Sequence, residues 1–166
     1  MDAISTARLQ TVIPELARRV ARLDSLLLTS QLCVHIRVVQ ARRSYADQAA
    51  LYAQGRTLPG KIVTDARPMD SMHIYGLAVD ACPDLPGLPT WQPDWNENDA
   101  RWKEFLSIAQ TCNLAEGAQW RTFNDFPHLY LGELPADPDD NLKELLTDGG
   151  VQAVWDWCNK TYQFAP

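Results

Sequence analysis

Two short stretches of the chain carry residues that could bind a metal ion and activate water. The first places His73 and Asp80 seven residues apart, with Gly76 between them. In the second, Asp125 precedes His128 by three residues. Two imidazoles and one carboxylate leave an open position on a zinc ion for water, and a further carboxylate nearby can act as a general base. The sequence therefore predicts a Zn²⁺ site with three protein ligands and a base, formed by His73, Asp80, His128 and Asp125.

Each of these residues also has an ordinary structural explanation when it is taken alone. His73 could be a surface histidine, Asp80 a turn residue and Asp125 a helix or turn cap. The spacing of the set, and not any single residue, favours the metal site. His35 is a weaker candidate, because it alternates along a β-branched run with no other ligand-type residue at metal spacing. We therefore expect a structural role for His35.

Composition and charge restrict the class of protein. The chain has 166 residues, 46% of them apolar, which predicts a soluble globular protein with a real core. Its net charge of -6 argues against a nucleic-acid partner, since phosphate binding needs a surplus of basic residues on one face.

The four cysteines form no CxxC pair, which argues against a thiolate metal site. Their even number permits two disulfides, but a chain of this length does not need them, so we expect free thiols at Cys33, Cys82, Cys112 and Cys158. Residues 1–5 lack a basic region followed by an apolar run, and no stretch approaches the roughly 20 apolar residues of a transmembrane helix. We expect synthesis in the cytoplasm without a signal peptide, and no transmembrane segment.

The elements that must position the candidate site follow from hydrophobic periodicity and capping signals. A helical stripe covers residues 5–30, and Pro14 fits as the first residue of its longer helix. Ser44 is predicted to cap a helix over 45–54 that ends at Gly55. A further amphipathic helix is expected over 99–112. Extended pieces are expected at 33–40, 62–64, 78–80 and 128–131, and a proline-rich loop at 83–89.

The composition changes after residue 134. We expect a catalytic domain over 1–134 and a C-terminal helical extension over 135–166, with helices at 140–147 and 151–161 joined at Gly149-Gly150. The extension contains Trp155, Trp157 and Tyr162, for which packing on the domain is favoured over a sugar-binding surface. We expect the extension to affect stability more than metal binding. The predicted fold class is α+β, with a small antiparallel sheet that carries the zinc site and is flanked by helices.

The two metal motifs together resemble a family of zinc peptidases that cut peptidoglycan stem peptides. The motifs are Ser71-x-His73-x-x-Gly76-x-Ala78-x-Asp80 and Asp125-x-Pro127-His128. The family contains D-Ala-D-Ala carboxypeptidases and phage L-alanyl-D-glutamate endopeptidases. The resemblance covers residues 14–132 and includes Arg43-Ser44-Tyr45-x-x-Gln48 upstream and Trp120-Arg121-Thr122-Phe123 downstream.

This resemblance implies roles for further residues. Arg43 is expected to polarise the scissile carbonyl or to hold a substrate carboxylate, and Gln48 and Ser71 are expected to support substrate binding. Two departures concern the substrate subsites: Arg42 stands where the family often has an aromatic residue, and residues 116–119 replace a tryptophan- and glycine-rich approach to Trp120. Peptidases with an H-x-H ligand pair or an H-E-x-x-H helix are excluded, since neither pattern occurs.

The resemblance implies a zinc-dependent peptidoglycan hydrolase of the phage endolysin type that cuts the L-alanyl-D-glutamate bond of the stem peptide. We expect a monomer that acts on the cell wall after release from the cytoplasm. Alternatives are a D-Ala-D-Ala carboxypeptidase, a non-catalytic cell-wall binding module that retains the metal, and a structural component of a phage particle.

Overall fold

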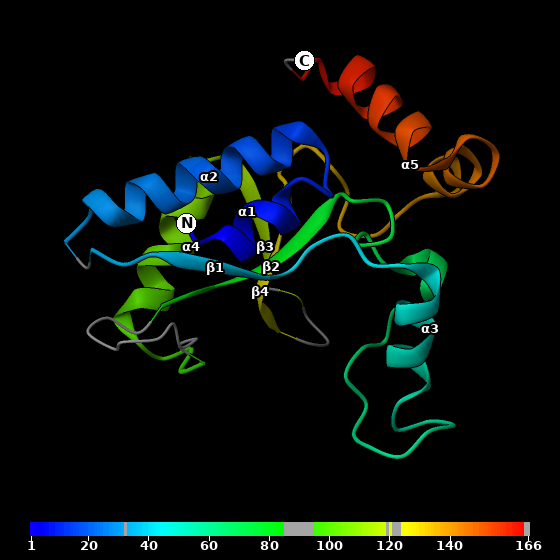
Figure 1. The fold of residues 1–166 in the computed structure, drawn as a ribbon, viewed down its shortest axis with the longest axis horizontal. Helices are drawn as coiled ribbons and strands as arrows, with labels where there is room; N and C mark the ends of the chain where they lie inside the picture. Colours follow the sequence, from blue (N-terminus) through cyan, green and yellow to red (C-terminus); the bar gives the residue numbers. More distant parts are fainter. Residues whose placement is uncertain (32, 85–94, 119, 121–123, 165–166) are drawn as a thin grey trace.

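A four-stranded antiparallel sheet with the order β1-β2-β4-β3 forms the centre of the fold (Figure 1). The strands are β1 (Ile36–Gln40), β2 (Ala78–Pro83), β3 (Leu114–Gly117) and β4 (Asp125–Leu131). The structure is a computed structural model that describes residues 1–31, 33–84, 95–118, 120 and 124–164.

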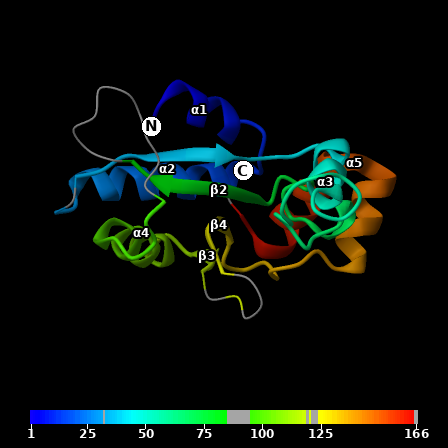
Figure 2. The same cartoon turned by 90° about the horizontal axis from the view of Figure 1, so that it is seen from below.

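The described residues also form six helical segments. They are α1 (Ala3–Leu9), α2 (Pro14–Thr29), α3 (Tyr45–Ala53), the 3₁₀ turn η1 (Pro68–Asp70), α4 (Ala100–Thr111) and α5 (Asp140–Tyr162). Figure 2 shows α1 beside β1 at one edge of the sheet and α4 toward the edge formed by β3. In Figure 1, α3 and the loop after it extend away from the sheet as an arm.

The helix starts follow the predicted capping chemistry. Pro14 is the first residue of α2, where its missing N–H costs no hydrogen bond. The Ser44 hydroxyl accepts from the backbone N–H of Asp47 at 3.1 Å at the start of α3. Both helix starts are confirmed.

Strand alternation separates the core from the candidate site. Val79 and Leu129 form a cross-strand pair and are fully buried in the hydrophobic core, to which α2 and α4 also contribute. Asp80 and His128 form the next pair, so their side chains point to the opposite face of the sheet. The core and the site are therefore built on the two faces of the same strands.

The predicted α+β class with a small antiparallel sheet is confirmed, but several boundaries differ. The strand predicted over 33–40 begins only at Ile36, which pairs with Pro83, the last residue of β2, and Cys33 adopts a left-handed conformation with φ 47°. β3 was not predicted, and β4 begins at Asp125 instead of His128. Residues 62–64 do not form a strand. Residues 85–89 of the predicted proline-rich loop lie outside the described residues.

The C-terminal extension folds as predicted into two helical pieces, which together make up α5 and meet at a kink. Gly150 has φ 68° and ψ -170°, a conformation that interrupts the helix and favours glycine. Leu142, Val154 and Cys158 are buried in the core, and the aromatic residues of α5 pack against it. This agrees with the packing prediction, whereas the boundary at 134/135 stays a prediction.

All four cysteines are free thiols. Over the described ranges, no helix has both the length and the apolar character that crossing a membrane requires.

A charged network ties α2 to the far edge of the sheet. Arg19, whose side chain is 10% exposed, donates to Glu15 at 2.6 Å, to Glu133 at 2.7 and 2.8 Å, and to the carbonyl of Asn113 at 2.7 Å. The hydrogen bonds from Arg19 lower the pKa of Glu133. Burial alone would raise the pKa of Glu15, but bonds from Arg18 and Arg19 leave it lowered.

We predict that Arg19→Met destabilises the fold by about 3 kcal/mol, because it leaves the part-buried carboxylate of Glu133 without its cation and the buried carboxylate of Glu15 with Arg18 alone. Urea unfolding measures this. Arg18→Met is the matched control: Arg18 bonds to the same Glu15 but is 61% exposed, so its loss should cost less than about 1 kcal/mol. Equal losses in the two variants would contradict the prediction.

The same network predicts an acid dependence. A carboxylate whose pKa is lower in the folded state stabilises the fold above its ordinary pKa, about 4.3 for glutamate, and this contribution is lost as pH falls through the folded value. The wild type should therefore lose more stability below about pH 4 than Arg19→Met does.

Candidate metal centre

The pairing of β2 with β4 brings two candidate ligands together, and the turn before β2 adds the third. Asp80 lies opposite His128 in the sheet, and its Oδ1 lies 3.2 Å from Nδ1 of His128. The same oxygen lies 3.2 Å from Nε2 of His73. One ligand atom from each residue lies within 4.8 Å of the others, a group that could hold a metal ion.

His73 is held in one orientation by backbone groups. Its Nδ1 lies 2.9 Å from the carbonyl oxygen of Ala41, which can only accept, so Nδ1 carries a proton and Nε2 is the ring nitrogen that faces Asp80. The carbonyl of His73 accepts from the backbone N–H groups of Arg43 and Gly76 at 3.0 and 3.2 Å. His73 thus presents Nε2 to Asp80 with both its ring and its backbone fixed.

The donor set fits zinc. His128 is buried, and its Nδ1 is the ring nitrogen that faces Asp80, so this imidazole offers Nδ1 to a metal ion. Burial alone would raise the pKa of Asp80, but His73 and His128 lower it on balance, so the carboxylate is ionised. Two imidazoles and an ionised carboxylate form an open set of three ligands that is typical of hydrolytic zinc.

Asp125 begins β4 on the wall of the same cleft, opposite Gly117 in the sheet. Burial and the charge of Asp80 raise the pKa of Asp125. A side chain at Gly117 would meet the carbonyl oxygen of Asp125 at 2.7 Å and Cβ of His128 at 3.2 Å, so glycine allows β3 to approach this close. Asp125 is therefore a carboxylate with increased proton affinity beside the three candidate ligands.

Arg43 also lines the cleft. Its Nη2 lies 3.5 Å from Oδ2 of Asp80, and its Nη1 donates to Oε1 of Gln48 at 2.5 Å. Gln48 is fully buried and donates in turn to the carbonyl of Ala66 at 2.9 Å. Burial lowers the pKa of Arg43, with Asp80, Asp125 and Asp47 opposing the shift, and a guanidinium stays charged at neutral pH.

The cleft has a volume of about 530 Å³ and contains every predicted site residue except Gln48, which lies behind Arg43. Ser71 is buried at the cleft wall. The ring of Trp120 packs 4.9 Å from that of His128. The remaining described lining residues are apolar, acidic or uncharged polar and include Leu51, Val63, Trp95, Asp70 and Asp137.

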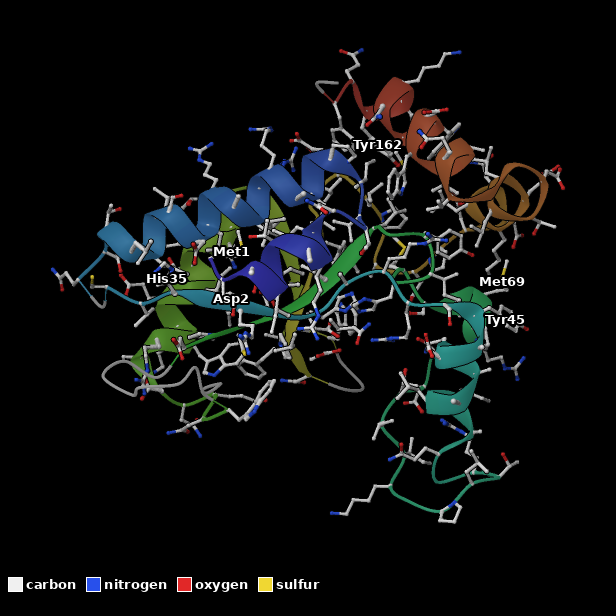
Figure 3. All side chains as sticks on the ribbon, in the orientation of Figure 1. Met1, Asp2, His35, Tyr45, Met69 and Tyr162 are labelled. Atoms are coloured by element: carbon white, nitrogen blue, oxygen red, sulfur yellow. The ribbon has the colours of Figure 1, made fainter. Side chains whose placement is uncertain are left out.

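His35 lies elsewhere, as predicted. Its Nδ1 lies 3.2 Å from Oδ1 of Asp24, which also pairs with the amino group of Met1 at 2.8 Å. Figure 3 places His35 near Met1 and Asp2, at the end of β1 away from α3. His35 therefore contacts Asp24 outside the cleft, and its structural role stays a prediction.

Sequence reasoning missed two supports of the site. The Ala41 carbonyl that orients His73 leaves no signal in the side-chain sequence. Gly117 did carry a signal, because an isolated glycine in a strand often marks a close approach of two backbones, but the strand around it was not recognised.

The segment that carries the candidate metal ligands is similar to known peptidases. Residues 64–131 match the model of the D-alanyl-D-alanine carboxypeptidase family, and this segment includes the three candidate ligands and Asp125. The peptidoglycan L-alanyl-D-glutamate endopeptidase CwlK of Bacillus subtilis (strain 168) is 38% identical over 100 residues, or 58% of this chain and 60% of CwlK. The predicted resemblance is confirmed, and the chain spans about three fifths of the length of this relative.

Two solved structures share the fold. The Serratia marcescens L-Ala D-Glu endopeptidase ChiX matches with a TM-score of 0.54 and 24% identity, over 79% of this chain and 88% of ChiX. The vancomycin resistance D,D-dipeptidase VanXYg matches with a TM-score of 0.53 and 16% identity, over 90% of this chain and 60% of that protein.

We predict that the purified protein binds about one equivalent of zinc and that His73→Ala loses it, because only two ligands remain. Metal analysis after gel filtration measures both. His35→Ala, which removes an imidazole outside the cleft, should keep the full equivalent. An active wild-type protein with less than about a tenth of an equivalent would contradict the assignment.

Proposed function

We propose that this chain is a zinc-dependent peptidoglycan hydrolase that cuts the amide bond between L-alanine and D-glutamate in the stem peptide. The observation that carries the proposal is that Asp125 and Arg43 meet the candidate metal ligands in one cleft. The relation to CwlK, which is named for this bond, supports the choice of substrate.

His73, Asp80 and His128 would hold the zinc ion, and the other cleft residues would complete the chemistry. When bound, zinc would polarise the scissile carbonyl and lower the pKa of water to about 7. Asp125 accepts a proton from the attacking water and later delivers it to the leaving amine. Its burial beside Asp80 raises its proton affinity, which suits a group that must take up a proton and release it again.

Arg43 supplies positive charge next to Asp80, with its Nη2 3.5 Å from Oδ2 of Asp80. The bonds to Gln48 and Asp80 fix the guanidinium, so it needs no reorganisation when substrate binds. Among the described residues lining the cleft, Arg43 is the only lysine or arginine. It would steady the developing oxyanion or bind the free α-carboxylate of D-glutamate, which lies next to the bond that is cut. Ser71 would contact substrate from the cleft wall.

A second candidate function is removal of the terminal D-alanine, which the description of the matching family favours. That reaction also places a carboxylate close to the scissile amide, so Arg43 would serve either. The two reactions differ in their effect on the peptidoglycan mesh. Trimming D-alanine leaves the crosslinked mesh intact, whereas cutting after L-alanine detaches the peptides from the glycan strands.

We further propose that the chain acts as a phage endolysin, as a monomer, since detachment of the peptides is the outcome that cell lysis requires. A non-catalytic wall-binding module would need the metal and the cleft but no base. The requirement for Asp125 therefore separates an enzyme from a binding module.

We predict that Asp125→Asn keeps the fold and the zinc but loses about 10²–10⁴-fold in turnover, because an amide cannot accept the proton. Release of soluble peptide from purified cell walls measures this. Asp137→Asn is the control: it removes one charge from another cleft carboxylate and should retain near-native turnover. Native turnover in Asp125→Asn would place the base elsewhere.

We predict that digestion leaves L-alanine on the muramic acid and exposes a new N-terminal D-glutamate. Mass spectrometry of purified muropeptides before and after digestion identifies both ends. Free D-alanine as the sole product would overturn the endopeptidase assignment in favour of the carboxypeptidase.

A further inference from the structure

We propose that Trp155 of α5 is a positioning residue for the metal centre and acts through the turn that carries His73. The inference rests on the proposed function only in taking zinc as the bound metal. Trp155 lies outside the family match over residues 64–131, so this contact belongs to the C-terminal extension of this chain.

The indole of Trp155 lies directly against the turn. Its Nε1 donates to the carbonyl oxygen of Tyr75 at 2.8 Å, two residues after His73. Gly76 follows with φ 65°, and a Cβ there would meet Cζ2 of Trp155 at 2.9 Å and the carbonyl oxygen of Thr11 at 3.1 Å. The glycine thus allows the turn to fit between the indole ring and the backbone of the α1–α2 connection.

The remaining bonds of the turn lead from this contact to the metal ligand. The Gly76 N–H donates to the carbonyl of His73 at 3.2 Å, and the Gly76 carbonyl accepts from the N–H of Ile13 at 2.9 Å. The Tyr75 hydroxyl donates to the carbonyl of Met69 at 2.8 Å. The residues from His73 to Gly76 are therefore clamped between the N-terminal helices and α5.

A clamp of this kind matters because ligand geometry must hold to within about 0.5 Å for a metal site to work. The bond from Nδ1 of His73 to Ala41 fixes the ring from the side of β1. Trp155 fixes the backbone of the turn through its bond to the carbonyl oxygen of Tyr75. Without the indole N–H, the Tyr75 carbonyl loses this partner, and the turn gains freedom next to the ligand.

The positioning role can be separated from the packing role, because α5 has other anchors. Leu142, Val154 and Cys158 are buried in the core, and Lys143 pairs with Asp70 at 2.9 Å. Removal of one indole hydrogen bond therefore leaves the helix attached. This goes beyond the expectation from sequence that the extension serves stability more than metal binding.

The test is Trp155→Phe, which keeps an aromatic ring but removes the N–H donor. We expect zinc to pass to a chromophoric chelator about tenfold faster than from the wild type, the lower end of the effect of losing a supporting hydrogen bond around a metal site. The matched control is Trp157→Phe, since Trp157 lies on the same helix and packs against Tyr162 with ring centroids 5.9 Å apart. It should release zinc at the wild-type rate.

Thermal unfolding of the metal-free proteins completes the experiment, and the two variants should have similar Tm values. A wild-type release rate in Trp155→Phe would overturn the proposal, as would equal acceleration in both variants, which would indicate general loosening of α5. Zinc-binding protein that fails to cut stem peptides would overturn the proposed function alone. A wild type that binds no zinc would overturn both.

Discussion

The register between β2 and β4 is the constraint on which the rest of the structure depends. It places Val79 opposite Leu129 on the core face and Asp80 opposite His128 on the cleft face. Because side chains alternate along a strand, a slip of one residue would turn both pairs to the wrong face. The apolar pair Val79–Leu129 therefore fixes the position of the polar pair Asp80–His128. The free energy gained by core burial offsets the cost of burying these two candidate ligands side by side.

The pKa values of two carboxylates in this cleft shift in opposite directions because their neighbours differ. Asp80 lies between two imidazoles, which lower its pKa and keep it ionised, as a metal ligand must be. Asp125 is half-buried near the charge of Asp80, which raises its pKa. The position of each residue relative to the two imidazoles thus separates a carboxylate suited to ligation from one suited to proton transfer.

The parts of this structure that depend on local sequence were predictable, and those that depend on distant backbone contacts were not. Pro14 and Ser44 determine helix starts through their own covalent and hydrogen-bonding chemistry, so one sequence suffices to locate them. β3 has only four residues and little alternation, and it exists because β4 pairs with it. The spacing of the metal motifs indicated the cleft, whereas the Ala41 carbonyl and the Trp155 indole reach the His73 turn from 32 and 80 residues away.

The sequence separations within the metal centre also set the order in which it can be assembled. His73 and Asp80 are only seven residues apart, whereas His128 follows Asp80 by 48 residues. A chain that folds as it is synthesised has two ligands early, and the third arrives only with the slow, non-local pairing of β4. Two ligands form an incomplete zinc site, so tight binding is acquired in the last step of sheet formation. Zinc affinity then reports whether β4 has paired with β2 in the correct register, because a misregistered chain lacks the third ligand and fails to retain the metal.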